Sequence, residues 1–431
     1  MAYIQPFRAL RYDPARVPVS EVVTQPYDKI TPEMQQQYHD ASPYNLVRII
    51  LGRPEPGDGD HSNVYTRAAE HFQQWRQTHI LRQDNKPSLY YYVQRFAPPD
   101  GGTSVERRGF IALGKVEDYS AGIVFRHEQT LSKPKADRLN LLRATRAHFG
   151  QIFMLYSDPK REIEGVLARD APPEIDVKDE YRVQHQVWPI SDPGTIAFVH
   201  NQMLDKKLII ADGHHRYETA LNYRNERRAG EPCDKASYEF VMMTFVNMDS
   251  PGLLILPTHR VVHGLENFSS QRFRQKASEF FSVEEVDPEI DGSRANVILR
   301  QAGQVGTAFL AVSRDRVFLL DRPRVPDPKL FAGLSFRQQQ LDVVQLHKVV
   351  LEHVLGISEE AIRNQQNVRY LRDTTQALRE VRNGEADISL LMNPVRIEQV
   401  RDIAFAGEVL PQKSTDFYPK LLSGLTIYAL A

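Results

Sequence analysis

The densest group of potentially reactive side chains lies between residues 207 and 221. An apolar run at residues 208–210 leads into one acid, a glycine, two imidazoles and a guanidinium: Asp212, Gly213, His214, His215 and Arg216. The pattern predicts a buried strand, a glycine turn and a helix over residues 215–229. A helix start presents free backbone N–H groups and the positive end of the helix dipole. We therefore expect this corner to receive an anion, above all a phosphate.

A purely structural role explains only part of this corner. Asp212 would cap the helix, which is worth about 1 kcal/mol, but this gives no reason for His-His-Arg. Glu218 lies four residues after His214, on the same face of the expected helix, where it can hold an imidazole or a metal ion with Asp212. This corner lacks the i, i+4 histidine pair of a zinc helix, which argues against structural zinc here.

A second polar segment spans residues 125–138, where Pro134 predicts a loop that enters a helix. Its side chains suit a phosphate clamp or acid–base work, and the candidates are His127, Glu128, Lys133, Lys135 and Arg138. A solvated charged loop at a helix entrance explains the same residues equally well.

Two further segments carry polar residues. Residues 26–29, Pro-Tyr-Asp-Lys, predict a fixed turn, and Thr31 is placed to cap a helix that begins at Pro32. Near the C-terminus, residues 411–420 offer Lys413, Ser414, Thr415 and Lys420 as ligands for a phosphate or a carboxylate. This loop does not match the P-loop pattern, and both segments can also be ordinary turns.

The composition limits the function classes. The chain has 431 residues, 41% hydrophobic and 25% charged, with a formal net charge of −1 and no basic block, which makes a nucleic-acid partner unlikely on electrostatic grounds. The single cysteine, Cys233, excludes an intramolecular disulfide. No apolar run has the length of a signal peptide or a membrane span, so we expect no membrane partner and a cytoplasmic location.

The elements that must position these motifs alternate between short apolar runs and helical patterns, which predicts an α/β (or α+β) protein with mixed sheets. We expect strands at 88–96, 107–116, 152–156, 238–248, 253–262, 307–312, 316–320, 367–371 and 387–392. Helices are expected at 135–148, 336–355, 373–382 and 394–404. After about residue 265 the strand patterns become weaker and the helical patterns longer. This change predicts one domain over 1–265 and a second over 266–431.

The stretch Ile210–Arg216 resembles a signature of the ParB/sulfiredoxin-like superfamily, which also follows a strand and opens a helix. Sulfiredoxins carry Gly-Gly-Cys-His-Arg there, and free serine kinases of this superfamily carry Asp-Gly-His-x-Arg, the closer form. The resemblance implies that His215 and Arg216 bind nucleotide phosphates. His214 stands where sulfiredoxins have their catalytic cysteine, which argues against sulfinic acid reduction.

The whole chain is similar to the domain-of-unknown-function-1015 family. Its members combine four segments, which occur here at Pro26–Asp28, His127–Arg138, Ala211–Tyr217 and Pro411–Lys420. Together the resemblances imply a ParB/sulfiredoxin-like nucleotide-binding core in the first domain. The second α/β domain would contribute the Lys-Ser-Thr loop.

These resemblances imply a nucleotide-dependent phosphotransferase for a small hydroxyl-bearing metabolite, with free serine as the leading example, and with ATP or ADP and Mg²⁺ as cofactors. The candidate catalytic residues are Asp212, His214 and Glu128. The candidate nucleotide ligands are His215, Arg216, Lys133, Lys135, Arg138, Lys413, Ser414 and Thr415. The candidate magnesium ligands are Asp212 and Glu218. Two alternatives use the same residues: a nucleotide or metabolite sensor without turnover, and a metal-dependent phosphoester hydrolase.

Overall fold

A computed structural model describes residues 1–99, 101–128, 133–230, 233, 236–324 and 328–430, and the side chains of residues 133–135 and 328 lie outside that description. The chain forms two compact units. Unit 1 comprises residues 1–126, 130–253 and 419–431, and unit 2 comprises residues 127–129 and 254–418. Unit 2 is discontinuous in sequence because it includes residues 127–129, and the chain returns to unit 1 at its C-terminal end.

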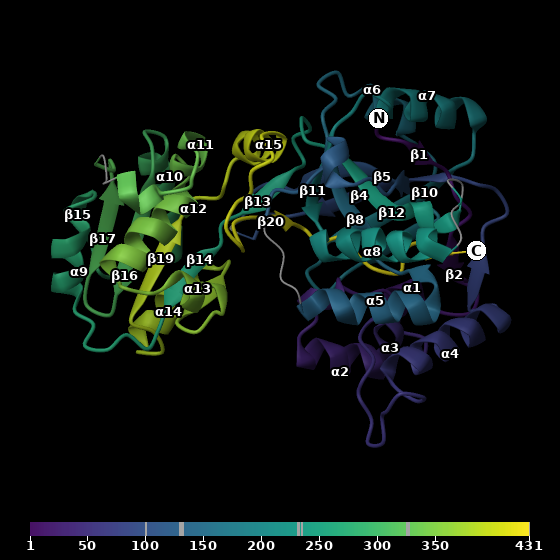
Figure 1. The fold of residues 1–431 in the computed structure, drawn as a ribbon, viewed down its shortest axis with the longest axis horizontal. Helices are drawn as coiled ribbons and strands as arrows, with labels where there is room; N and C mark the ends of the chain where they lie inside the picture. Colours follow the sequence, from purple (N-terminus) through teal and green to yellow (C-terminus); the bar gives the residue numbers. More distant parts are fainter. Residues whose placement is uncertain (100, 129–132, 231–232, 234–235, 325–327, 431) are drawn as a thin grey trace. The chain divides into compact units, whose positions relative to one another are not determined.

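Unit 1 is built on a nine-stranded mixed sheet (Figure 1). The strands run in the order β6 (Val124–Phe125), β11 (Leu208–Asp212), β8 (Ile152–Tyr156), β12 (Phe240–Asn247), β5 (Val105–Lys115), β4 (Leu89–Phe96), β10 (Gln184–Ile190) and β9 (Ile175–Lys178), with β1 (Ile4–Gln5) beside β5. The β11–β6 and β12–β8 pairs are parallel and the other pairs are antiparallel. The structure therefore confirms a mixed α/β architecture.

The apolar runs recognised in the sequence form the central strands of this sheet. All residues of β8 and β12 are buried, as are Leu208–Ala211 of β11. Near-continuous apolar runs are typical of strands covered on both faces. The β4–β5 hairpin, the strand at 152–156 and the strand expected at 238–248 are confirmed.

Helices and two small sheets complete unit 1. α5 (Lys133–Thr145) packs against α8 (His214–Gly230) and α4 (Val64–Gln77), as Figure 1 shows. A second buried cluster, which contains Phe72, Trp75 and Phe149, lies under α4. The remaining helices are α1 (Val19–Val22), α2 (Pro32–Ala41), α3 (Val47–Ile50), α6 (Glu162–Leu167) and α7 (Pro193–Met203). The small sheets pair β2 (Leu10–Tyr12) with β3 (Leu81–Gln83), and β7 (Ala147–His148) with β21 (Tyr428–Ala429).

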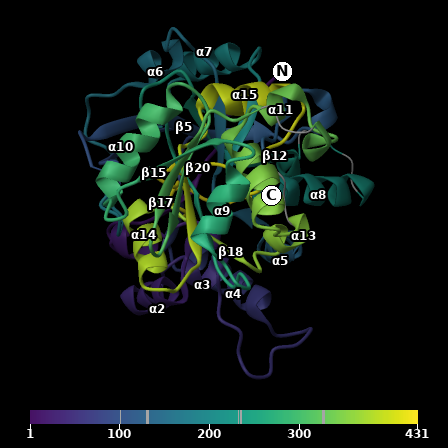
Figure 2. The same cartoon turned by 90° about the vertical axis from the view of Figure 1, so that its left-hand side faces the viewer.

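Unit 2 contains a six-stranded antiparallel sheet. Its order is β15 (Ser282–Val286), β17 (Val317–Asp321), β16 (Ala308–Ser313), β19 (Ile388–Met392), β14 (His259–Val262) and β18 (Val368–Leu371). Figure 2 shows α10 (Gly292–Gly303) and α14 (Thr374–Arg382) together on one side of this sheet and α9 (Ser270–Ala277) on the other. The four strands expected in this part of the sequence are confirmed.

Two expectations for unit 2 need correction. The strand expected over 253–262 is two strands, because Pro257 interrupts the ladder: β13 (Leu254–Leu256) pairs with β20 (Asp416–Tyr418), and β14 joins the main sheet. The helix expected over 336–355 is also divided, into α11 (Phe336–Gln339), α12 (Asp342–Gln345) and a π-helix over Leu346–Val354. The remaining helices of the unit are α13 (Glu359–Arg363) and α15 (Ile397–Phe405).

The predicted division of the chain into domains 1–265 and 266–431 stays a prediction. The compact units differ from it at residues 254–265, which lie in unit 2, and at residues 419–431, which lie in unit 1. The reason is the pairing of the strands, since β14 belongs to the second sheet and β21 pairs with β7 of unit 1. No helix among the described residues is long and apolar enough to cross a membrane.

Candidate functional site

The strand–turn–helix predicted from residues 207–229 is present at the end of β11. Asp212 is the last residue of the strand, and α8 begins at His214. Gly213 makes the turn with φ +92°, a conformation that favours glycine, and an added Cβ would lie 2.9 Å from Arg216 Nε. The Gly213 carbonyl accepts from the Tyr217 N–H at 3.0 Å, which closes the first helical turn. The sequence therefore predicted this corner correctly.

Asp212 is held by two cations. Lys420 Nζ donates to Asp212 Oδ1 at 3.0 Å, and Arg216 Nη2 donates to Oδ2 at 2.7 Å. The side chains remain partly accessible, at 20% for Asp212, 15% for Arg216 and 8% for Lys420. Arg216 also donates through Nη1 to the carbonyl of Gln151 on the neighbouring segment. The guanidinium is therefore fixed in position at the start of α8.

The charge around Asp212 is predominantly positive. Burial by itself would raise the pKa of Asp212, but Lys420, Arg216 and Lys29 hold it well below its usual value. Arg107 also interacts electrostatically with Asp212, and burial lowers the pKa of this arginine to about 10, so it stays charged at neutral pH. One carboxylate thus stands among four cations. Such an excess of positive charge favours a bound anion.

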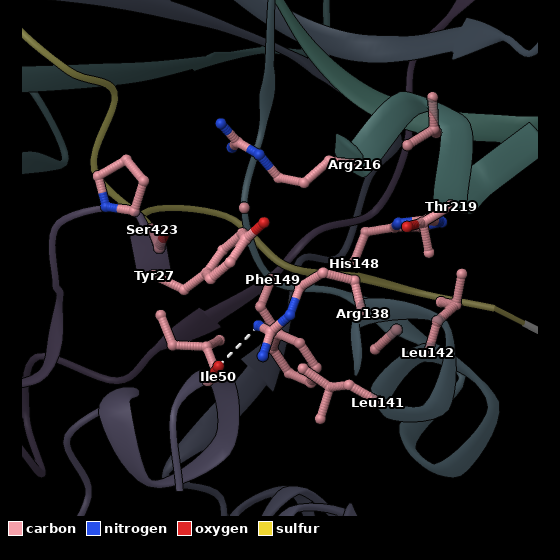
Figure 3. Close-up of a pocket in the computed structure, with 14 residues that line it drawn as sticks. Tyr27, Ile50, Arg138, Leu141, Leu142, His148, Phe149, Arg216, Thr219 and Ser423 are labelled. Carbon is pink, nitrogen blue, oxygen red and sulfur yellow. Dashed lines mark hydrogen bonds between the residues drawn. The ribbon is translucent and has the colours of Figure 1, made fainter. Parts of the chain in front are cut away.

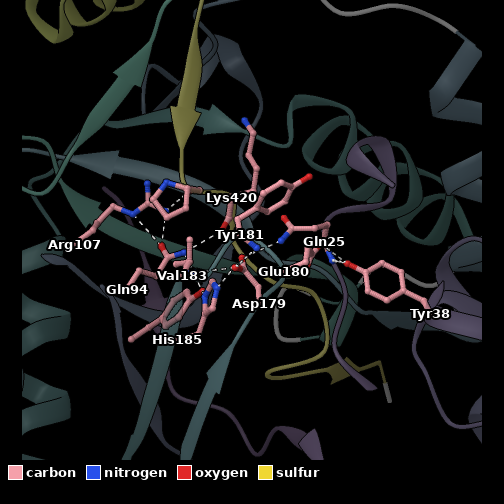
Figure 4. Close-up of polar contacts among 12 residues, drawn as sticks. Gln25, Tyr38, Gln94, Arg107, Asp179, Glu180, Tyr181, Val183, His185 and Lys420 are labelled. Carbon is pink, nitrogen blue, oxygen red and sulfur yellow. Dashed lines mark hydrogen bonds and ion pairs between the residues drawn. The ribbon is translucent and has the colours of Figure 1, made fainter. Parts of the chain in front are cut away.

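A network of buried polar groups places Lys420 (Figure 4). Gln94 Nε2 donates to the Lys420 carbonyl at 2.9 Å, and Arg107 donates to the Pro419 carbonyl and to Gln94 Oε1. The Arg107 guanidinium lies 4.7 Å from the centre of the Phe153 ring. Gln94 and Arg107 face each other across the β4–β5 hairpin. The hairpin therefore fixes the backbone from which Lys420 reaches Asp212.

A buried histidine extends this network toward the N-terminal segment. His185 Nδ1 lies 2.6 Å from Tyr92 Oη, and His185 Nε2 lies 3.2 Å from Asp179 Oδ2. Asp179 Oδ2 also accepts from Gln25 Nε2 at 3.0 Å. Because burial lowers the pKa of His185, its ring stays neutral at neutral pH. Gln25 directly precedes the Pro26–Asp28 motif, so the network links that motif to the sheet.

A small cavity of about 70 Å³ adjoins Arg216 (Figure 3). Arg216, Tyr27 and Arg138 line it from three segments, and the Arg138 guanidinium lies 4.1 Å from the centre of the Tyr27 ring. Arg138 also donates through Nη1 to the Ile50 carbonyl at 2.7 Å. The cavity is far smaller than the roughly 300 Å³ at which ordinary ligand pockets begin. Its size suits a phosphate-like group rather than a whole nucleotide.

The other predicted residues of α8 have different surroundings. His214 and His215 are half-buried in its first turn, and Glu218 is buried. Burial and, next, the charge of Glu218 raise the pKa of Tyr119, which places this carboxylate near that phenol. Both Asp212 oxygens face cations, and the described residues contain no group of three or more His, Cys, Asp or Glu arranged for a metal. These contacts do not favour direct metal ligation by Asp212, and Mg²⁺ at Asp212 and Glu218 stays a prediction.

Unit 2 brings the beginning of the His127–Arg138 motif into contact with residues 410–415. His127 Nε2 lies 2.7 Å from Thr415 Oγ1, and the Leu410 N–H donates to the His127 carbonyl at 2.8 Å. The Lys413 N–H donates to Glu128 Oε1 at 2.7 Å, and the Ser414 hydroxyl donates to the Pro411 carbonyl. The predicted Lys133 and Lys135 carry side chains that lie outside the described part of the chain. Within unit 2 the Thr415 hydroxyl therefore pairs with an imidazole, the Ser414 hydroxyl with a backbone carbonyl and the Glu128 carboxylate with a backbone N–H.

Sequence reasoning missed Gln94 and Arg107. Both are buried polar residues on strands whose other inward positions are apolar or aromatic. A charged residue at a buried strand position is a signal for a paired or functional group. The sequence cannot show that the partner is the backbone of Pro419, which lies 312 residues away.

The sheet and the strand–helix corner define a mixed α/β protein with a cation-rich candidate site. The chain belongs to the family described as "Protein of unknown function (DUF1015)", whose model matches residues 4–358. No curated relative matches the chain.

Among solved structures, a free serine kinase variant in complex with AMP is similar at 14% identity and a TM-score of 0.36, over 70% of this chain and 89% of that one. A conserved hypothetical protein from Pyrococcus furiosus is similar at 14% identity and a TM-score of 0.35, over 70% and 92%. SbnI from Staphylococcus aureus, truncated at its C-terminus, is similar at 12% identity and a TM-score of 0.34, over 73% and 87%.

Proposed function

We propose that the protein is a nucleotide-dependent phosphotransferase that acts on a small hydroxyl-bearing metabolite such as free serine. The observation that carries this proposal is the cluster of Lys29, Arg107, Arg216 and Lys420 around Asp212 at the start of α8. Phosphoryl transfer depends mainly on positioning and charge neutralisation, which fixed cations provide. The likeness of Asp212–Arg216 to the Asp-Gly-His-x-Arg signature supports the same chemistry.

In this proposal a phosphoryl group lies at the first turn of α8. Arg216 and Lys420 neutralise its charge, and His215 and the free N–H groups of the helix donate to its oxygens. Arg138 lines the same cavity as Arg216 and would serve as a further cation. Since the cavity has a volume of only about 70 Å³, the rest of the nucleotide would lie outside it.

Asp212 has the role of organising charge in this site. A carboxylate whose pKa is held well below its usual value is a weak proton acceptor at neutral pH. We therefore assign Asp212 to the positioning of Lys420 and Arg216. The proton of the substrate hydroxyl would go to His214, since an imidazole exchanges protons in the neutral range. Glu128 stays the second candidate base predicted from the sequence.

The experiment is a product assay on the full chain. The protein is incubated with ATP or ADP, magnesium and a panel of hydroxyl-bearing amino acids, and phosphorylated product is measured by ³¹P NMR. We expect a product with at least one substrate and a loss of at least tenfold in Arg216→Gln. The matched control is Arg143→Gln, because Arg143 forms an ion pair with Glu226 on the surface of the same unit. Absence of nucleotide binding would refute the proposal.

A sensor without turnover is the second candidate, and the low pKa of Asp212 favours it because the centre of the cluster then lacks a strong base. A sensor would bind ATP or ADP and lose that binding in Arg216→Gln, yet release no phosphorylated product. The same assay therefore separates the two functions.

A further inference from the structure

Unit 2 contains a cavity outside every motif discussed so far. Its volume is about 1320 Å³, and it lies where the end of α10, the α11–α12 segment and the start of α15 meet. Its lining includes Arg300, Thr307, Phe336, Asp342, Gln345 and Arg396. A cavity of this size exceeds the roughly 300–1,000 Å³ typical of small-molecule sites, so a metabolite can enter it.

Two acceptor side chains, Asp342 and Gln345, lie on the lining of the cavity. Asp342 Oδ1 accepts from the Thr307 hydroxyl at 2.8 Å. Gln345 is 6% exposed, and its Oε1 is buried with no hydrogen-bond partner among the described residues, whereas its Nε2 donates to the Gln339 carbonyl. A buried acceptor without a donor is unfavourable unless a ligand or a water satisfies it. A ligand that brings N–H donors would satisfy both groups.

The guanidinium-bearing residues Arg300 and Arg396 line the same cavity. Arg396 interacts electrostatically with Asp342, and the described residues include no ion pair between the two side chains. Arg300 likewise forms no ion pair with a described residue. Opposite charges that line one cavity and form no ion pair with each other suit a ligand that carries both charges.

Phe336 adds an apolar surface. Its side chain is 76% exposed although it lies on the lining of the cavity. An exposed aromatic ring beside a polar cavity is typical of a site that covers the apolar part of a ligand.

We infer that this cavity binds an α-amino acid with an apolar side chain. The ammonium group would donate to Asp342 and Gln345 Oε1, the carboxylate would lie on Arg396 and Arg300, and the side chain would cover Phe336. This site is independent of the phosphotransfer proposal, because all of its residues belong to unit 2 and none belongs to the Asp212 cluster.

The test is isothermal titration of the full chain with leucine, phenylalanine and serine. Isoamylamine and 4-methylpentanoate serve as the analogues of leucine that lack one charged group. We expect leucine or phenylalanine to bind in the micromolar to millimolar range and each analogue to bind at least tenfold more weakly. Asp342→Asn and Arg396→Gln should each weaken amino-acid binding at least tenfold. Arg401→Gln is the matched control, because Arg401 lies on the same helix and forms an ion pair with Asp402.

Thermal melting of each variant separates lost binding from lost folding, and Arg396→Lys offers a milder change that keeps the charge. Absence of binding by all three amino acids at 10 mM would overturn the inference. So would binding that Asp342→Asn and Arg396→Gln leave unchanged while both remain folded. Lys420→Met should leave leucine binding intact, whereas its loss in that variant would move the site to unit 1 and overturn the inference as well.

Discussion

Lys420 donates a 3.0 Å hydrogen bond to Asp212, a residue 208 positions earlier in the chain. This contact closes the cation cluster at the start of α8. It also explains how the C-terminal segment, after β20 in unit 2, contributes to a strand–helix corner of unit 1. The geometry of the proposed site therefore depends on the return of the chain to unit 1 at residue 419.

The first prediction concerns Lys420 itself. Lys420→Met should weaken binding of ADP or inorganic phosphate at least tenfold, equal to about 1.4 kcal/mol, because it removes the ammonium that faces Asp212. The salt dependence of binding should also decrease, since one fewer cation takes part. Lys206→Met is the matched control, because Lys206 pairs with Asp205 in the same unit. Equal affinities of the two variants, measured by calorimetry, would contradict the site.

The second prediction concerns the support of Lys420 by Gln94. Gln94→Glu keeps acceptors for Arg107 but removes the donor to the Lys420 carbonyl, so anion affinity should fall about three- to tenfold. In the background of Lys420→Met the same change should have little effect, because coupled residues are not additive.

Tyr90→Phe is the control for this double-mutant cycle. Tyr90 also lies on β4, and its hydroxyl bonds to Asp84 and to the Ala9 N–H, away from Lys420. Tyr90→Phe should lower the free energy of unfolding and leave the anion affinity unchanged. Additive effects of Gln94→Glu and Lys420→Met would mean that Gln94 stabilises the sheet alone.

The third prediction concerns the turn at Gly213. Gly213→Ala should destabilise the protein by about 1–3 kcal/mol, because φ is +92° and the new Cβ would lie 2.9 Å from Arg216 Nε. Anion affinity should fall as well, since Arg216 must move. Gly165→Ala, at an open position within α6, should be neutral or stabilising by urea denaturation. A stable Gly213→Ala variant with unchanged affinity would disprove this role of the turn.

The fourth prediction concerns pH. Burial lowers the pKa of His259 to about 4, and its Nδ1 accepts from the Met392 N–H at 3.3 Å. A neutral buried histidine contributes stability fully above its unfolded pKa of about 6.5 and loses it as the pH falls toward 4, by up to about 3 kcal/mol.

Melting curves of His259→Asn should accordingly depend less on pH between 6.5 and 4 than those of the unaltered protein. An asparagine can accept from the same N–H without binding a proton in this range. The exposed His61→Asn should keep the original dependence. An unchanged pH profile in His259→Asn would show that other groups control acid unfolding.

Local patterns in the sequence determined much of this protein. The apolar run at 208–210 and Gly213 predicted β11, its turn and α8, because strand burial and positive φ are local requirements. Thr31 was likewise predicted to cap α2, and its hydroxyl accepts from the Met34 N–H. The family was predicted from four short motifs, and its model matches residues 4–358.

Tertiary structure alone decided how these pieces combine. Pro257 divides one apolar run between two sheets. Gln94 on β4 donates to the Lys420 carbonyl, and Arg107 on β5 donates to the Pro419 carbonyl. Hydrogen bonds between residues hundreds of positions apart depend on strand order, which no local pattern encodes. The charges were visible in the sequence, but their common neighbour, Asp212, became visible only in the fold.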